Sequence, residues 1–155
     1  MDEKTKKNIT EKAGALLDAG WHCSEAMLVA VGEQYFKVTA DTIRLSTPFA
    51  GGVGGTHDEL CGALTGGLMV IGGIMGRSDV ATEDQACQDA AAAYREAFLA
   101  HFGQLRCCEL KENWIGQPGK PDCAELVRQA AGVLVNVLAE AGVDLSSYRN
   151  AGQVN

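Results

Sequence analysis

The sequence predicts an all-α, single-domain bundle of about five to six helices over residues 1–155, with a glycine-rich helix at its centre. Three observations predict this class. Apolar residues recur at helical spacing along most of the chain, no strand-like alternation of useful length occurs, and capping residues stand at the ends of the periodic segments. With 155 residues, 46% hydrophobic and 21% charged, the chain has the size and composition of one ordinary globular domain.

The first half of the chain contains three expected helices. The first ends at Gly20, and its apolar stripe consists of Ile9, Ala13, Leu16 and Leu17. After Trp21 and His22 a second helix begins, with the same spacing in Cys23, Met27, Ala30 and Val31. A short third helix occupies residues 39–45, where Thr39 is the expected cap.

Ten of the 19 glycines lie between Gly51 and Gly76, around a single cysteine, Cys61. We expect a loop over residues 48–55, after which Thr56 and Glu59 have the T-x-x-E form of a capping box and predict the start of the central helix. Residues 60–76 carry no charge, but 17 residues fall short of the roughly 20 that a membrane span needs. We therefore expect a buried helix and no membrane span.

Two further helices complete the bundle. Thr82 with Gln85 predicts the start of the next helix, which ends at Gly103. Residues 111–121 are expected to form a loop, and Asp122 is expected to cap the last helix, which begins with Cys123.

The charge of the chain excludes some partners. A net charge of −7 and a pI near 4.9 argue against binding to nucleic acid or to an anionic membrane surface. The first residues lack the apolar core of a signal peptide, so we expect a cytoplasmic protein. In a reducing compartment, six cysteines indicate ligands, redox thiols or core residues rather than disulfides.

Four cysteines are candidate site residues, and three of them fall at or near expected helix starts, where unpaired N–H groups and the helix dipole lower a thiol pKa. Cys23, Cys61 and Cys123 are the three at expected helix entries, whereas Cys107, with Cys108 as a substitute, is expected in a turn that follows Gly103. We expect them to converge on one site. For each one taken alone, packing in the core is the alternative, and it is the expected role of Cys87. No Cys-x-x-Cys pair occurs, and the spacings match no zinc finger or ferredoxin.

The glycines have two expected roles around these thiols. The first group is expected to bring backbone N–H groups toward sulfur, as in anion-binding nests; it consists of Gly51, Gly52, Gly54 and Gly55. The second group is expected to let neighbouring helices approach closely; it consists of Gly62, Gly66 and Gly67. His57 precedes Cys61 by four residues, which permits a contact on one helix face, with a capping or surface role as the alternative.

The segment "CGALTG", Cys61 to Gly66, matches the Cys-Gly-Ala-x-x-Gly motif of the C_GCAxxG_C_C family of redox-active proteins, which this sequence resembles. Other elements of the family resemble "WHCSEAML", "PFAGGVGG", "HFGQLRCCEL" and "DCAELVRQAAGVLVNVL". The resemblance implies that all four family cysteines have counterparts here, with Cys108 as an extra. A related domain in split-Soret-type cytochromes is thought to hold a non-haem iron centre, which favours iron over zinc by analogy.

We therefore expect a redox protein in which four thiolates bind an iron–sulfur cluster for electron transfer to a partner protein, or for redox sensing. One alternative is metal-free thiol–disulfide chemistry. Another is a structural zinc site, or an interaction module in which the GxxxG surface packs against a second subunit as a homodimer. A Cys–His nucleophile is disfavoured, and the glycine-rich loop lacks the Lys-Ser/Thr of a phosphate-binding loop.

Overall fold

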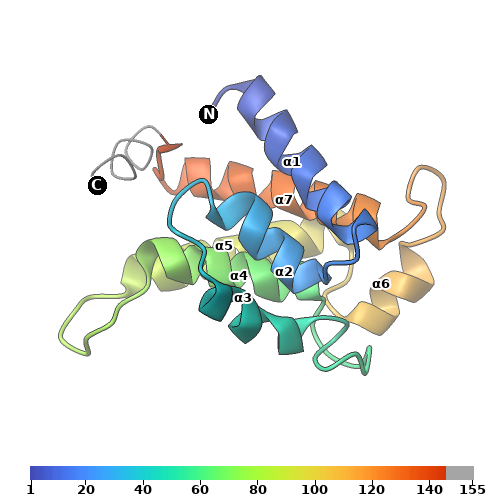
Figure 1. Cartoon of the computed structure of the whole chain (residues 1–155), viewed down its shortest axis with the longest axis horizontal. Coiled ribbons are helices and arrows are strands. Elements are labelled where there is room, and N and C mark those ends of the chain that lie inside the picture. The colour runs from blue at the N-terminus through green and yellow to red at the C-terminus, as the bar shows by residue number, and fades with distance from the viewer. Residues whose placement is uncertain (146–155) are drawn as a thin grey trace.

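The computed structural model describes residues 1–145, and residues 146–155 of the predicted domain lie outside the described part. Between residues 1 and 145 there are seven α-helices and no sheet, so the all-α prediction is confirmed and the helix count exceeds the predicted five to six. α1 (Glu3–Asp18) and α7 (Cys123–Glu140) pack against each other along one side of the bundle (Figure 1).

The glycine-rich helix α4 (Gly62–Met75) lies at the centre, as predicted. It contacts α2 (Cys23–Met27), α5 (Gln85–Phe102) and α7. Its buried apolar side chains include Leu64 and Ile71, which are at most 1% exposed. Because this helix touches three others, its surface controls how closely they can approach.

Two glycines of α4 make these approaches possible, which confirms the prediction for Gly66 and Gly67. A Cβ on Gly66 would lie 2.6 Å from the carbonyl oxygen of Ser24 in α2. A Cβ on Gly67 would lie 2.3 Å from the ring of Tyr94 in α5. Both distances are shorter than any real Cβ contact, so a side chain at either position would push the helices apart.

The second helix differs from the prediction along its length. α2 begins at Cys23 as expected, but after Met27 the chain continues as a π-helical segment, η1 (Leu28–Gly32). All five residues of η1 are buried. The next helix, α3 (Ala40–Ser46), begins where it was predicted, because the Thr39 hydroxyl accepts a hydrogen bond from the N–H of Thr42. A short 3₁₀ turn, η2 (Thr47–Phe49), then leads into the glycine-rich loop.

The predicted capping box at Thr56 is wrong. Residues 51–55 all have positive φ, between 58° and 72°, so the chain makes a left-handed turn here. Glycine adopts this backbone without the steric penalty that other residues suffer, and four of the five residues are glycines. The Thr56 hydroxyl donates to the carbonyl oxygen of Gly52 within this turn, and α4 begins only at Gly62, with Cys61 as its N-cap.

Two helices in the second half of the chain differ from the prediction. α5 begins at Gln85 after Asp84, so Thr82 is not its cap, whereas Gly103 with φ of 77° ends it as predicted. A helix that the sequence analysis missed, α6 (Cys107–Asn113), includes the start of the expected loop 111–121. The prediction for α7 is confirmed, since the Asp122 carboxylate accepts from the N–H of Glu125.

Over residues 1–145, none of the helices combines the length and the apolar character that crossing a membrane demands.

Candidate functional site

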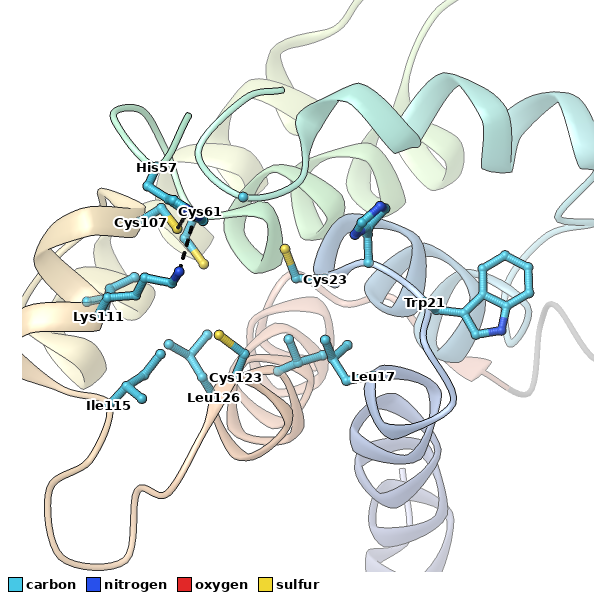
Figure 2. A pocket seen from close by; sticks show the side chains of 14 residues that line it. Leu17, Trp21, Cys23, His57, Cys61, Cys107, Lys111, Ile115, Cys123 and Leu126 are labelled. Carbon is cyan, nitrogen blue, oxygen red and sulfur yellow. Dashed lines mark hydrogen bonds between the residues drawn. The ribbon is translucent and has the colours of Figure 1, made fainter. Parts of the chain in front are cut away.

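Four cysteines from four different helix starts line one cavity. Cys23, Cys107 and Cys123 are the first residues of α2, α6 and α7, and Cys61 is the N-cap of α4. The cavity has a volume of about 190 Å³ (Figure 2). The structure therefore places the four predicted thiols together, although the first and the last are 100 positions apart in the sequence.

Main-chain hydrogen bonds hold Cys61 beside Cys107. The N–H of Cys61 donates to the carbonyl oxygen of Leu105 at 2.8 Å, and the N–H of Cys107 donates to that of Glu59 at 2.9 Å. These bonds flank an antiparallel bridge between Leu60 and Arg106. Both thiols are buried, at 6% and 8% exposure. Of the vicinal pair, Cys107 lines the cavity and the half-buried Cys108 does not.

Glycines make room for two of the thiols. A Cβ on Gly62 would lie 2.2 Å from the sulfur of Cys23. A Cβ on Gly52 would lie 2.9 Å from the Cβ of Cys107. Gly51 lines the cavity itself. Each of these glycines is therefore in contact with the site.

Gly54 and Gly55 do not direct their backbone N–H groups toward the thiol sulfurs, as the sequence had predicted. A Cβ on either would have no heavy atom within 4 Å, so both face open space. Their N–H groups donate within the loop, to the carbonyl oxygens of Pro48 and Ala50 at 2.7 and 3.2 Å. They shape the left-handed turn and do not direct hydrogen bonds at sulfur.

The thiol pKa values differ from the sequence-based expectation. Burial raises the pKa of Cys61, Cys107 and Cys123, and the neighbouring Cys23 raises each of them further. The N–H groups of Ala63 and Leu64 lower the pKa of Cys61, as a helix start should, but burial outweighs them. The expectation of lowered pKa values is thus wrong for these three thiols.

His57 contacts a different cysteine from the one expected. Residues 57–60 are not helical, so the spacing of four residues to Cys61 gives no contact on a helix face. Instead, His57 Nδ1 lies 3.3 Å from the sulfur of Cys107, and His57 Nε2 lies 3.3 Å from Lys111 Nζ. Figure 2 shows Lys111 extending toward this ring from α6.

Sequence reasoning missed Lys111 and the apolar wall. The sequence predicted Lys111 to lie in a loop. In the structure it follows Cys107 by one turn of α6 and lies on the same helix face. The spacing of four residues would have indicated this contact if α6 had been predicted. The apolar wall comprises Leu17, Leu110, Ile115, Leu126 and Val127. Trp21, which is 42% exposed, and His22 also line the cavity.

The thiols surround the cavity rather than meet at a point. Among the residues that the structure describes, no group of three or more His, Cys, Asp or Glu side chains is arranged to hold a metal ion. A Cys₄ zinc site needs all four sulfurs about 2.3 Å from one ion. The arrangement in residues 1–145 therefore differs from that of a closed single-ion site.

The raised pKa values predict a pH dependence of stability for the reduced, metal-free protein. The folded state holds these three thiols protonated at a pH where unfolded cysteines, with a pKa of about 8.5, have lost their protons. Stability falls with pH wherever the folded state binds more protons. We expect the free energy of unfolding, measured with urea under reducing conditions, to fall between pH 7 and pH 9.5.

Alanine variants separate this effect from the titration of other groups. Cys61→Ala removes the most deeply buried of the three thiols, so the free energy of unfolding is expected to decrease less between pH 7 and pH 9.5 than in the wild type. Cys87 lies outside the cavity, so Cys87→Ala is expected to leave the pH dependence of the free energy of unfolding unchanged. The same slope in the wild type and in Cys61→Ala would contradict the raised pKa.

Comparison with known protein families supports the resemblance seen in the sequence. The family described as "Putative redox-active protein (C_GCAxxG_C_C)" matches residues 21–137, which is more than half of the chain and includes all four thiols. No curated protein and no solved structure matches the chain. On this match, the chain belongs to the C_GCAxxG_C_C family of redox-active proteins.

Proposed function

We propose that this protein is a one-electron carrier or redox sensor in which Cys23, Cys61, Cys107 and Cys123 hold an iron–sulfur cluster. The observation that carries the proposal is the meeting of four thiols, from four helix starts, around one cavity. Thiolates are the usual ligands of such clusters. Membership of a redox-active family supports the same conclusion.

The cavity has room for a group of several atoms. A single water requires about 10–15 Å³ of such volume, whereas this cavity measures about 190 Å³. Ligands of a multinuclear cluster bind different metal atoms, so they stand around it and do not converge on one ion. Thiols that line a cavity wall suit this arrangement better than they suit a single zinc ion.

The surrounding residues would protect and tune such a group. Leu110, Leu126 and Val127 are at most 2% exposed and keep water from one side of the cavity. Burial raises the pKa of Cys107 and Cys123, and the charge of Lys111 partly offsets this rise, so it favours the thiolates that ligation requires. When bound, an iron–sulfur cluster supplies one-electron chemistry, with a reduced one-electron carrier protein as donor and an oxidised one as acceptor.

Purification without oxygen tests the proposal. We expect a brown protein that absorbs visible light and contains iron and acid-labile sulfide in stoichiometric amounts. Colourless protein with neither iron nor sulfide, even after reconstitution with both, would overturn the proposal. Zinc in place of iron would establish the structural-zinc alternative, and a cysteine–cysteine bond in mass spectra after mild oxidation of metal-free protein would favour thiol–disulfide chemistry.

A further inference from the structure

Two side chains single out Cys107 from the other three thiols. Lys111 Nζ lies 3.3 Å from His57 Nε2, and His57 Nδ1 lies 3.3 Å from the Cys107 sulfur (Figure 2). An ammonium group has donors and no acceptor, so Nε2 must accept from Lys111. In a neutral imidazole the other nitrogen then carries the hydrogen, and Nδ1–H donates to the sulfur.

The backbone holds His57 in place on both sides. Its φ is 66°, a left-handed conformation that is uncommon for residues other than glycine. The N–H of His57 donates to the carbonyl oxygen of Gly51, and its own carbonyl oxygen accepts from the N–H of Cys108, both at 2.8 Å. Strained conformations persist only where the surroundings fix them, and they cluster at functional sites.

Lys111 brings positive charge to this wall of the cavity. None of the described residues lining the cavity is Asp or Glu, so no carboxylate of the lining neutralises the ammonium group. Lys111 stands one helical turn after Cys107 on α6, which directs it to the same face. The charge therefore lies next to the one sulfur that also receives the histidine hydrogen bond.

We propose that Lys111 and His57 act together as a cationic hydrogen-bond donor to the Cys107 sulfur, and that this pair stabilises the reduced form of the bound centre. The inference rests on the proposed function. Reduction adds one electron and no proton, so the reduced centre carries one more negative charge than the oxidised one. Hydrogen bonds to the sulfurs and nearby charge are among the factors that set cluster potentials. His57 and Lys111 are thus positioning and tuning residues rather than ligands.

The test measures the reduction potential of anaerobically purified protein, with dithionite as the electron donor. His57→Gly removes the ring and leaves a residue suited to positive φ, and Lys111→Met removes the charge but retains an unbranched side chain. We expect both variants to keep their iron and to favour the oxidised form about tenfold more than wild type, which is about 59 mV toward negative potential for a one-electron couple.

Two further variants sharpen the test. Lys120→Met removes the same charge from a lysine that lies over the Trp114 ring, outside the cavity, and is expected to shift the potential far less. Because Lys111 acts through His57, the double variant is expected to shift the potential by less than the sum of the single variants.

The outcomes separate the two proposals. Wild-type protein without iron would overturn the proposed function and this inference with it. Full iron content with an unchanged potential in both His57→Gly and Lys111→Met would overturn the inference alone. A reduction-potential shift in Lys120→Met equal to that in Lys111→Met would also overturn the inference, because the potential would then depend on the net charge of the protein and not on the position of Lys111.

Discussion

The Cys61→Ser variant is expected to retain no iron after purification without oxygen. Cys61 is the N-cap of the central helix, lies beside Cys107 and lines the cavity. A serine hydroxyl is a much poorer ligand for iron–sulfur clusters than a thiolate. Iron and sulfide analysis of purified and reconstituted protein would measure the loss.

Two other cysteines provide matched controls for this experiment. Cys87 packs against the core from α5, and Cys108 neighbours Cys107 in α6; neither lines the cavity. Cys87→Ser and Cys108→Ser are expected to keep their iron, with a stability loss of about 1 kcal/mol or less for these half-buried positions. Equal iron loss in Cys61→Ser and Cys87→Ser would show that the ligands are misassigned.

Gly66→Ala is expected to destabilise the protein by about 1–3 kcal/mol, the usual range for overpacking a core. The new methyl group would lie 2.6 Å from the carbonyl oxygen of Ser24 and 2.8 Å from its Cα. Both are backbone atoms, so α2 as a whole must shift. Urea denaturation of wild type and variant would measure the difference.

Gly72→Ala in the same helix is the matched control. A Cβ on Gly72 would have no heavy atom within 4 Å, and its backbone is helical. Replacing glycine by alanine in a helix stabilises by about 0.5–1 kcal/mol, so the two substitutions are expected to have opposite signs. Destabilisation by Gly72→Ala equal to that by Gly66→Ala would contradict the close approach of α2 and α4. Because Cys23 begins α2, only Gly66→Ala should also lower the iron content.

Local signals in the sequence were sufficient for most of the helices. Apolar spacing located α1 and α7, and short-range side-chain caps at Thr39 and Asp122 located two helix starts. The placement of Cys23 and Cys123 at helix starts followed from these elements. Gly66 and Gly67 could be assigned to helix contacts because a buried helix has few other uses for glycine.

The remaining features depend on contacts between distant segments. Thr56 has the sequence form of a helix cap. However, the N–H of Cys61 donates to the carbonyl oxygen of residue 105 and the N–H of Cys107 donates to that of residue 59, so α4 begins only at Gly62. α6 has only seven residues, too few for an apolar period to be evident. With α6 unrecognised, the approach of Lys111 and His57 to Cys107 could not be predicted.

Because the four thiols lie between residues 23 and 123, a chain synthesised only as far as residue 122 lacks one of them. The last of them emerges from the ribosome only after the central helix has been made, and α7 must dock against α1 to deliver it. Under the proposed function, the full ligand set is available only after residue 123 has been synthesised. A polypeptide that ends before α7 would lack Cys123, Leu126 and Val127 of the cavity lining, so under the proposed function a truncated product is expected to bind no iron.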